Sequence, residues 1–131
     1  FVNKLSNKIY AIDSNLSSIE NARVNLKYNN IYNVTLINDK AEKCLPNLVS
    51  EIQNDEIIAI INPPRRGIYP EVIDSLKKIK VKQIIYISCN AISAKKDIRD
   101  LGIKNDNIKD IIPIDQFPWC HHYETIFNII F

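Results

Sequence analysis

Short apolar runs alternate with segments of helical periodicity along the whole chain, and this alternation constrains the fold more than any other feature. The runs are rich in isoleucine and most of them end at a polar residue. Strands that alternate with helices in units of about 30 residues are typical of α/β proteins with a parallel sheet and helices on both faces. The predicted strands are 8–13, 34–39, 56–61, 83–89, 108–115 and 123–131, and the predicted helices are 14–30, 41–53, 70–79 and 91–101.

Capping and helix-breaking residues set the expected ends of the helices. Ser14 or Asn15 is a suitable N-cap for the first helix, and Pro70 fits the first turn of the third. Pro46 is expected to interrupt the helix predicted over 41–53. Gly102 follows the fourth helix and is expected to end it.

Two of the predicted strands carry information about their neighbours. Residues 56–61 form a continuous apolar run, which predicts a strand covered on both faces, and Pro63 and Pro64 then end the ladder pairing. Only the segment QFPWCHH separates the last two strands. Because this segment is too short for a helical crossover, these strands are predicted to be antiparallel neighbours.

Composition bounds the class of protein. The 131 residues suffice for one domain, and no apolar run approaches the roughly 18 residues that cross a membrane. Three cysteines without a CxxC pair favour a reducing compartment, and therefore the cytoplasm, over a disulfide framework. The net charge of +2 identifies no partner, and the local lysine clusters are typical of solvated helix faces. Methionine is absent and only two glycines occur, so we expect a part of a larger protein without a glycine-rich phosphate loop.

Polar or reactive residues end four of the predicted strands: Asp13, Asp39, Asn62 and Cys89. Any one of them has a structural explanation as a helix cap or a loop residue. In open α/β sheets, however, ligands bind outside the carboxyl ends of the strands. Four such residues at one edge therefore indicate a functional site.

Three ordered segments carry a resemblance to a known family. INPPRRG (61–67), YISCNAISAKKDI (86–98) and PIDQFPWCHHYE (113–124) resemble the signatures of the S-adenosyl-L-methionine-dependent RNA uracil-5 methyltransferases, most of all the bacterial branch that acts on 23S ribosomal RNA. KIYAID (8–13) with NARVNLKYNN (21–30) is similar to the cofactor-side segment of that family. The resemblance implies an α/β, Rossmann-like class I methyltransferase fold with a mostly parallel sheet and an antiparallel C-terminal strand. Residues 1–131 would be the C-terminal part of the catalytic domain, lacking the first strand and the glycine-bearing cofactor loop, and would be weakly active or inactive alone.

The chemistry of that family needs an activated thiol and a base. Carbon 5 of uracil is a poor nucleophile until a thiolate adds to carbon 6, and a base must later remove the proton from carbon 5. The resemblance makes Cys89 the nucleophile and Glu124 the base, with S-adenosyl-L-methionine as the cofactor. Their structural alternatives are a packed cysteine at a strand end and a carboxylate bonded within the protein.

The resemblance also implies roles around the cofactor and the target base. Asp13 would bind the ribose diol of the cofactor, Asp39 would lie near its adenine, and Asn62 would lie between cofactor and base, where many relatives carry Asp. Both aspartates have the alternative role of N-caps. Arg65 would contact RNA phosphate or a carboxylate of the protein, and His122 would orient the substrate or the base, or be structural.

The segment WCHH (119–122) departs from the usual His-Thr of the family at its first two positions. Trp119 would stack on an extruded base or, as the stronger expectation, pack the loop. Cys120, His121, His122 and Cys89 lack the spacing of a structural zinc site, so no metal is predicted.

The predicted function is methylation of carbon 5 of a uridine in RNA, with ribosomal RNA as the first expectation and tRNA as the second, and no membrane partner. One alternative is an amino methyltransferase, since Asn-Pro-Pro also opens motifs that hold a planar amino group; those motifs usually continue with an aromatic residue, where this chain has Arg65. Another is a non-catalytic RNA-binding remnant, which would bind RNA in a salt-dependent way and ignore the cofactor.

Overall fold

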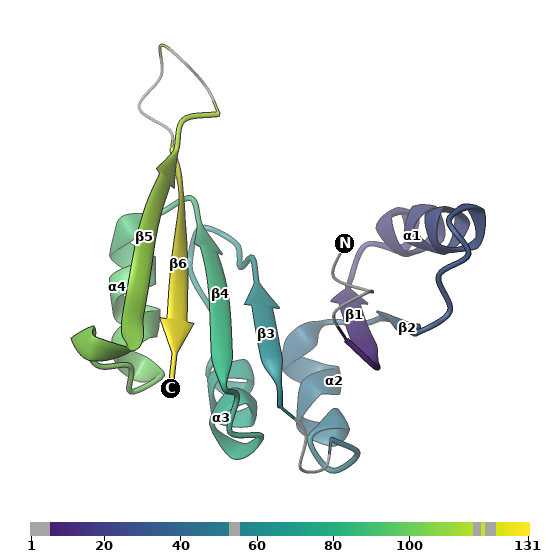
Figure 1. The fold of residues 1–131 in the computed structure, drawn as a ribbon, viewed down its shortest axis with the longest axis horizontal. Helices are drawn as coiled ribbons and strands as arrows, with labels where there is room; N and C mark the ends of the chain where they lie inside the picture. The colour runs from purple at the N-terminus through teal and green to yellow at the C-terminus, as the bar shows by residue number, and fades with distance from the viewer. Residues whose placement is uncertain (1–5, 53–55, 117–118, 120–122) are drawn as a thin grey trace. The chain divides into compact units, whose positions relative to one another are not determined.

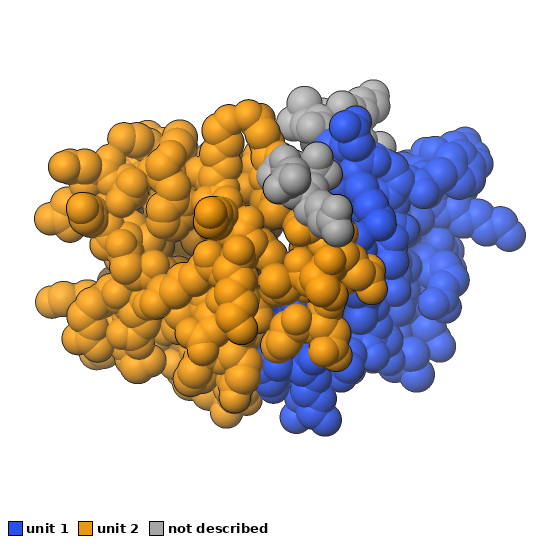
Figure 2. Space-filling model, turned by 90° about the horizontal axis from the view of Figure 1, so that it is seen from below, with its two compact units in different colours: residues 1–45 blue, residues 46–131 orange. Residues whose placement is uncertain are grey.

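The computed structural model describes residues 6–52, 56–116, 119 and 123–131. The chain divides into two compact units, residues 1–45 and residues 46–131, which Figure 2 colours separately. Each unit is built from the alternating strands and helices that the sequence predicts (Figure 1).

The first unit is a βαβ element. Strand β1 (Ile9–Asp13) pairs in parallel with β2 (Val34–Asn38), and helix α1 (Leu16–Tyr28) connects them. The register runs from Ile9 opposite Val34 to Asp13 opposite Asn38. Asn15 is the N-cap, as one of the two predicted choices, because its side-chain oxygen accepts a hydrogen bond from the backbone N–H of Ser18 at 3.2 Å.

The second unit contains a four-stranded sheet in the order β3-β4-β6-β5 (Figure 1). The parallel pair at one side is β3 (Ile58–Ile61) with β4 (Gln83–Ser88). Strand β6 (Glu124–Ile130) is antiparallel to both β4 and β5 (Ile108–Ile114), which confirms the predicted antiparallel neighbours. The helices of this unit are α3 (Pro70–Lys78) and α4 (Ala91–Asp100), with a short 3₁₀ turn at Asn105–Asn107. Helix α2 (Ala41–Leu48) contains residues of both units.

The core of this unit lies between one face of the sheet and the helices α3 and α4. Ile84, Tyr86 and Ile129 of the sheet are fully buried, as is Ala94 of α4. On α3, Leu76 is only 4% exposed. Alternation along β4 explains this one-sided burial, since residues 84, 86 and 88 share a face and are buried while 83, 85 and 87 are half-buried.

Two expectations about these elements are wrong. Strand β3 is not covered on both faces, because Ile58 and Ile60 are 60% and 56% exposed, so the apolar run alone overstated the burial. The helix predicted over 41–53 ends at Leu48. Pro46 lies inside it and supplies no backbone N–H, which removes one helical hydrogen bond just before the end.

The β1–β2 ladder and the four-stranded sheet share no strand pairing among the described residues. The predicted sheet is therefore present as two separate ladders, with parallel pairing in β1–β2 and β3–β4 and antiparallel pairing in β4–β6 and β5–β6.

Candidate functional site

The carboxyl edge of the four-stranded sheet gathers three of the predicted site residues. Asn62 directly follows β3, and Cys89 directly follows β4, which is parallel to β3. Glu124 is the first residue of β6, and because β6 is antiparallel to β4, it starts at the same edge. Figure 1 shows the ends of β3 and β4 and the start of β6 at the upper edge of this sheet.

The strand register brings Cys89 and Glu124 to the same end of the β4–β6 ladder. The last pair of the β4–β6 ladder is Ser88 opposite Thr125. Cys89 directly follows Ser88, in the bend after β4, and Glu124 directly precedes Thr125, so each lies one residue beyond that pair. Within β6, Glu124 is one step from Thr125, so its side chain is directed to the opposite face of the sheet from that of Thr125.

The burial of these two side chains differs from that of ordinary surface residues. Cys89 is a free, half-buried cysteine. Glu124 is also half-buried, and its Oε2 atom is buried without a hydrogen-bond partner among the described residues. A buried carboxylate oxygen without a donor is unfavourable, and a catalytic role is one of the explanations for such an atom. The pair can thus offer a nucleophile and a proton acceptor to a ligand at this edge.

Ser88 and Asn90 hold the Cys89 backbone in place. The Ser88 hydroxyl donates to the carbonyl oxygen of Asn90 at 2.9 Å and accepts from the backbone N–H of Asn90 at 3.1 Å. The Asn90 side-chain oxygen caps α4 by accepting from the N–H of Ile92 at 3.0 Å. The Ser-Cys-Asn order therefore has a local reason, because the cysteine is fixed between a strand end and a helix start.

The loop after β3 is attached to the same segment. The Asn90 side-chain amide donates to the carbonyl oxygen of Arg65 at 3.1 Å, and the N–H of Ile68 donates to Asp97 Oδ2 at 2.7 Å. Tyr86, three residues before Cys89, also donates its hydroxyl to Asp97 Oδ2 at 2.8 Å. Burial raises the pKa of Tyr86 above its ordinary value, and the hydrogen bond to Asp97 adds to this effect. The sequence does not predict these three hydrogen bonds. One signal was available, because Asp97 lies three residues after Ala94 and four before Leu101, the spacing of the buried face of a helix.

Asn62 and Arg65 are exposed on this loop, beside the turn that holds Cys89. The neighbouring Arg66 lies over the ring of Tyr69, with its guanidinium carbon 4.1 Å from the ring centroid. The loop therefore presents cationic side chains at the edge where Cys89 lies.

Asp13 and Asp39 lie at the carboxyl edge of the β1–β2 ladder. Asp13 pairs with Asn38, and Asp39 is one residue further on. Both side chains are exposed, and each uses one oxygen locally at 2.7 Å: Asp13 accepts from the N–H of Asn15, and Asp39 from the N–H of Lys40. Neither is the helix N-cap. Both still offer a carboxylate at a strand end, the donor set that suits a ribose diol.

The last predicted residues lie near the β5–β6 connection. His122, Cys120 and His121 are outside the described residues. Trp119 is described, and its exposure of 104% shows that its ring does not pack the loop. Within the described ranges, no three His, Cys, Asp or Glu side chains are grouped so that they could hold a metal ion.

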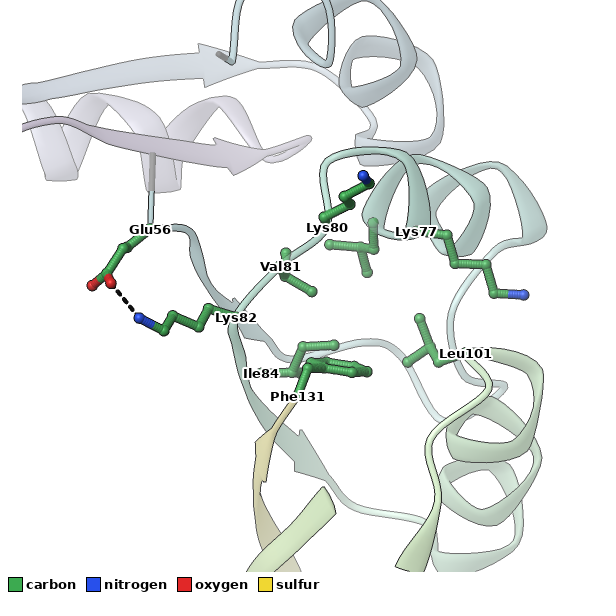
Figure 3. A pocket seen from close by; sticks show the side chains of 9 residues that line it. Glu56, Lys77, Lys80, Val81, Lys82, Ile84, Leu101 and Phe131 are labelled. Atoms are coloured by element: carbon green, nitrogen blue, oxygen red, sulfur yellow. Dashed lines mark hydrogen bonds and ion pairs between the residues drawn. The ribbon is translucent and has the colours of Figure 1, made fainter. Parts of the chain in front are cut away.

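A pocket of about 540 Å³ lies at the opposite edge of the sheet (Figure 3). Its apolar lining includes Val81, Leu101 and Phe131, and its rim carries Lys77 and Lys80. A surface ion pair between Lys82 and Glu56 closes one side. None of the predicted site residues that the structure describes lines this pocket, so it is separate from the Cys89 edge.

No helix in the described part of the chain combines the length and the apolar character that crossing a membrane requires.

Among relatives of known sequence, a Clostridium acetobutylicum protein described as an uncharacterized RNA methyltransferase is 30% identical over 126 residues. That match covers 96% of this chain but 27% of the relative, so the chain spans about a quarter of its length.

Solved structures agree with this relationship. The chain resembles the Pyrococcus abyssi tRNA (uracil-54, C5)-methyltransferase, crystallised with S-adenosyl-L-homocysteine, with a TM-score of 0.76 and 25% identity; the match covers 98% of this chain and 30% of that one. An rRNA methylase from Streptococcus thermophilus matches this chain with a TM-score of 0.66 and 14% identity, over 99% of this chain and 78% of that one. At this identity the likeness is evidence for the fold alone. These neighbours confirm the predicted Rossmann-like methyltransferase fold.

A family model described as tRNA (uracil-5-)-methyltransferase matches residues 2–129. Because this match spans nearly the whole sequence, the chain belongs to the tRNA (uracil-5-)-methyltransferase family.

Proposed function

We propose that this chain is the catalytic part of an enzyme that transfers a methyl group from S-adenosyl-L-methionine to carbon 5 of a uridine in RNA. Membership of the family supports the reaction class. The bound S-adenosyl-L-homocysteine of the P. abyssi structure supports the cofactor, since that molecule is the demethylated product of S-adenosyl-L-methionine.

The observation that carries the proposal is the register of β4 and β6. The Ser88–Thr125 pair brings both residues to one end of the ladder, where the Cys89 thiol is free and half-buried and the Glu124 carboxylate has a buried oxygen without a partner among the described residues; this supports the pairing of a nucleophile with a base. A thiol and a carboxylate on one small site are the two groups that uracil-5 methylation requires.

The chain's residues would act in this order. The Cys89 thiolate forms a bond to carbon 6 of the uracil, which moves electron density to carbon 5 and the carbonyl at carbon 4. S-adenosyl-L-methionine, when bound, supplies a methyl group carried on a positively charged sulfur. Once carbon 5 holds the methyl group, Glu124 removes the proton that carbon 5 still carries. The electrons of that C–H bond then reform the double bond between carbons 5 and 6 as the Cys89 sulfur leaves.

Other residues would position the partners. Asp13 would accept hydrogen bonds from the cofactor ribose and Asp39 would lie near its adenine; their exposed carboxylates at strand ends fit these roles. Asn62 would lie between cofactor and base and hydrogen-bond the uracil, because its amide both donates and accepts. Arg65 would bind phosphate, and His122 would orient the base. The glycine-bearing cofactor loop is proposed to lie outside these 131 residues.

The proposed substrate is 23S ribosomal RNA in the cytoplasm, on the wording of the motifs at 61–67 and 86–98. The P. abyssi relative acts on tRNA, so tRNA is the competing substrate. Transfer of tritiated methyl groups to 23S rRNA and to tRNA transcripts by the full-length protein separates the two.

The test of the mechanism is covalent trapping with RNA that contains 5-fluorouridine. Fluorine replaces the hydrogen on carbon 5, so Glu124 has no proton to remove there. The bond between Cys89 and carbon 6 should therefore persist, and the protein–RNA adduct should migrate more slowly than the free protein on a denaturing gel. Cys89→Ala should abolish the adduct and methyl transfer. Cys44→Ala is the matched control, because Cys44 is also free and half-buried, and it should behave as the wild type.

Glu124→Gln should still form the bond to carbon 6 and should accumulate the adduct on ordinary uridine RNA. Methyl transfer that survives Cys89→Ala would instead identify the amino methyltransferase. RNA binding without methyl transfer, and without thermal stabilisation by S-adenosyl-L-methionine, would identify the RNA-binding remnant.

A further inference from the structure

A buried aspartate lies behind the Cys89 edge, and the proposed mechanism gives it no task. Asp97 of α4 is 0% exposed. Its Oδ2 atom accepts two hydrogen bonds, from the backbone N–H of Ile68 at 2.7 Å and from the hydroxyl of Tyr86 at 2.8 Å. Its Oδ1 atom is buried without a partner among the described residues. Burial of a carboxylate is unfavourable, so its retention here needs a reason.

The donors to Asp97 come from both sides of the site. Ile68 lies in the loop between β3 and α3, the same loop that carries Asn62 and Arg65. Tyr86 belongs to β4, three residues before Cys89, and its ring also makes an edge contact with Phe127 of β6 at 6.0 Å between centroids. One carboxylate thus joins the loop after β3 to the strand that ends at Cys89.

Gly67 lies in close contact with the Asp97 carboxylate. Gly67 has a φ of +93°, and a Cβ atom there would lie 2.5 Å from Asp97 Oδ2 and 2.7 Å from Oδ1. The loop therefore rests directly on the carboxylate. A second tie comes from Asn90, whose amide donates to the carbonyl oxygen of Arg65.

We propose that Asp97 is a positioning residue for uridine methylation, which fixes the loop of residues 62–68 against the turn that holds Cys89. The inference rests on the proposed function and deepens it, by assigning the placement of Asn62 relative to the Cys89 sulfur to a buried carboxylate. Asp97 touches neither substrate nor cofactor. It acts through the Ile68 N–H and the Tyr86 hydroxyl.

Two substitutions separate positioning from simple stability. Asp97→Ala removes both acceptors and leaves the Ile68 N–H and the Tyr86 hydroxyl unpaired. Asp97→Asn can keep the accepting oxygen at the Oδ2 position and place its amide nitrogen where Oδ1 has no partner. Asp100→Ala is the matched control on the same helix, because that carboxylate makes only surface ion pairs in the described structure, with Lys96 and Arg99.

The readout is the single-turnover rate of adduct formation with 5-fluorouridine RNA, measured on full-length protein at saturating RNA and expressed per folded molecule. Asp97→Ala should lower this rate by about 100-fold, the effect expected of a displacement near 1 Å, while affinity for S-adenosyl-L-methionine is unchanged. Asp97→Asn should restore most of the rate, and Asp100→Ala should match the wild type. If Asp97→Ala does not fold, Tyr86→Phe, which removes one donor only, should still slow the adduct at unchanged cofactor affinity.

The outcomes distinguish the two proposals. An unchanged adduct rate in folded Asp97→Ala, or in Tyr86→Phe if Asp97→Ala does not fold, overturns the positioning role and leaves the proposed function standing, provided that Cys89→Ala forms no adduct. Failure of Asp97→Asn to recover any rate above that of Asp97→Ala also overturns it. If the wild type forms no adduct, or Cys89→Ala forms one, the proposed function itself fails.

Discussion

Replacing Gly67 with alanine should destabilise the protein far more than the same change at Gly102. Both glycines have left-handed backbone conformations, with φ of +93° and +75°. They differ in their surroundings, because a Cβ at position 67 meets the Asp97 carboxylate at 2.5 Å whereas a Cβ at position 102 meets nothing within 4 Å. The pair thus separates the backbone effect from the steric one.

The expected magnitudes follow from those contacts. A left-handed conformation costs an alanine about 1–2 kcal/mol, and this is the whole effect at Gly102. At Gly67 the overpacking adds about 1–3 kcal/mol, because Asp97 is fully buried and held by two hydrogen bonds, so it cannot retreat without breaking them. Gly67→Ala should therefore reduce the free energy of unfolding by about 2–5 kcal/mol, which a protein of ordinary stability survives.

Urea unfolding followed by circular dichroism measures both variants. With an m-value of about 2 kcal/mol/M, the steric part alone should separate their midpoints by about 0.5–1.5 M. In an Asp97→Ala background the clash is absent, and Gly67→Ala should then cost no more than Gly102→Ala, giving a coupling of about 1–3 kcal/mol in the double-mutant cycle. Equal destabilisation at the two glycines, or no coupling with Asp97, would refute the geometry described for this loop.

Three further predictions concern single side chains. Burial raises the pKa of Tyr86 above its ordinary 10.0, so the stability that the protonated hydroxyl contributes is complete below pH 10.0 and should be lost as the pH rises above that value. Urea unfolding between about pH 9 and about pH 11 should show this loss in the wild type and a smaller loss in Tyr86→Phe. Burial also raises the pKa of the Cys44 thiol, and repulsion from Asp39 adds to the effect. Iodoacetamide at about pH 8 should therefore label Cys44 more slowly than the amino acid cysteine in solution, as mass spectrometry can test, and equal rates would contradict this cause. Asn15→Ala should cost about 1 kcal/mol of unfolding free energy through loss of the Ser18 N–H contact, and a comparable loss in Ser14→Ala would argue against the cap.

The order and type of the elements could be predicted from the sequence. Apolar runs, Asn15 as a cap and Pro70 at a helix start are local signals, and local signals determine where strands and helices begin. Burial was less predictable: Ile58 and Ile60 read as a covered strand, yet they are more than half exposed. Exposure depends on what packs against a face, and an apolar run carries no information about that partner.

The site shows the same division. The position of Cys89 at a strand end and the antiparallel course of the last two strands are readable from the residues. The role of Asp97 is not readable from the residues, because its donors, Ile68 and Tyr86, lie 29 and 11 residues away along the chain.

The sequence by itself determined the α/β alternation, the residue types available for chemistry and the edge of the sheet at which they lie. Only the tertiary structure decided that residues 89 and 124 lie at the same end of the β4–β6 ladder, that the Glu124 Oε2 atom is buried without a donor among the described residues, and that Asp97 joins the loop after β3 to the strand before Cys89. The physical reason is range: helix and strand signals act over a few neighbouring residues, whereas pairing register and burial depend on contacts between segments far apart in the chain.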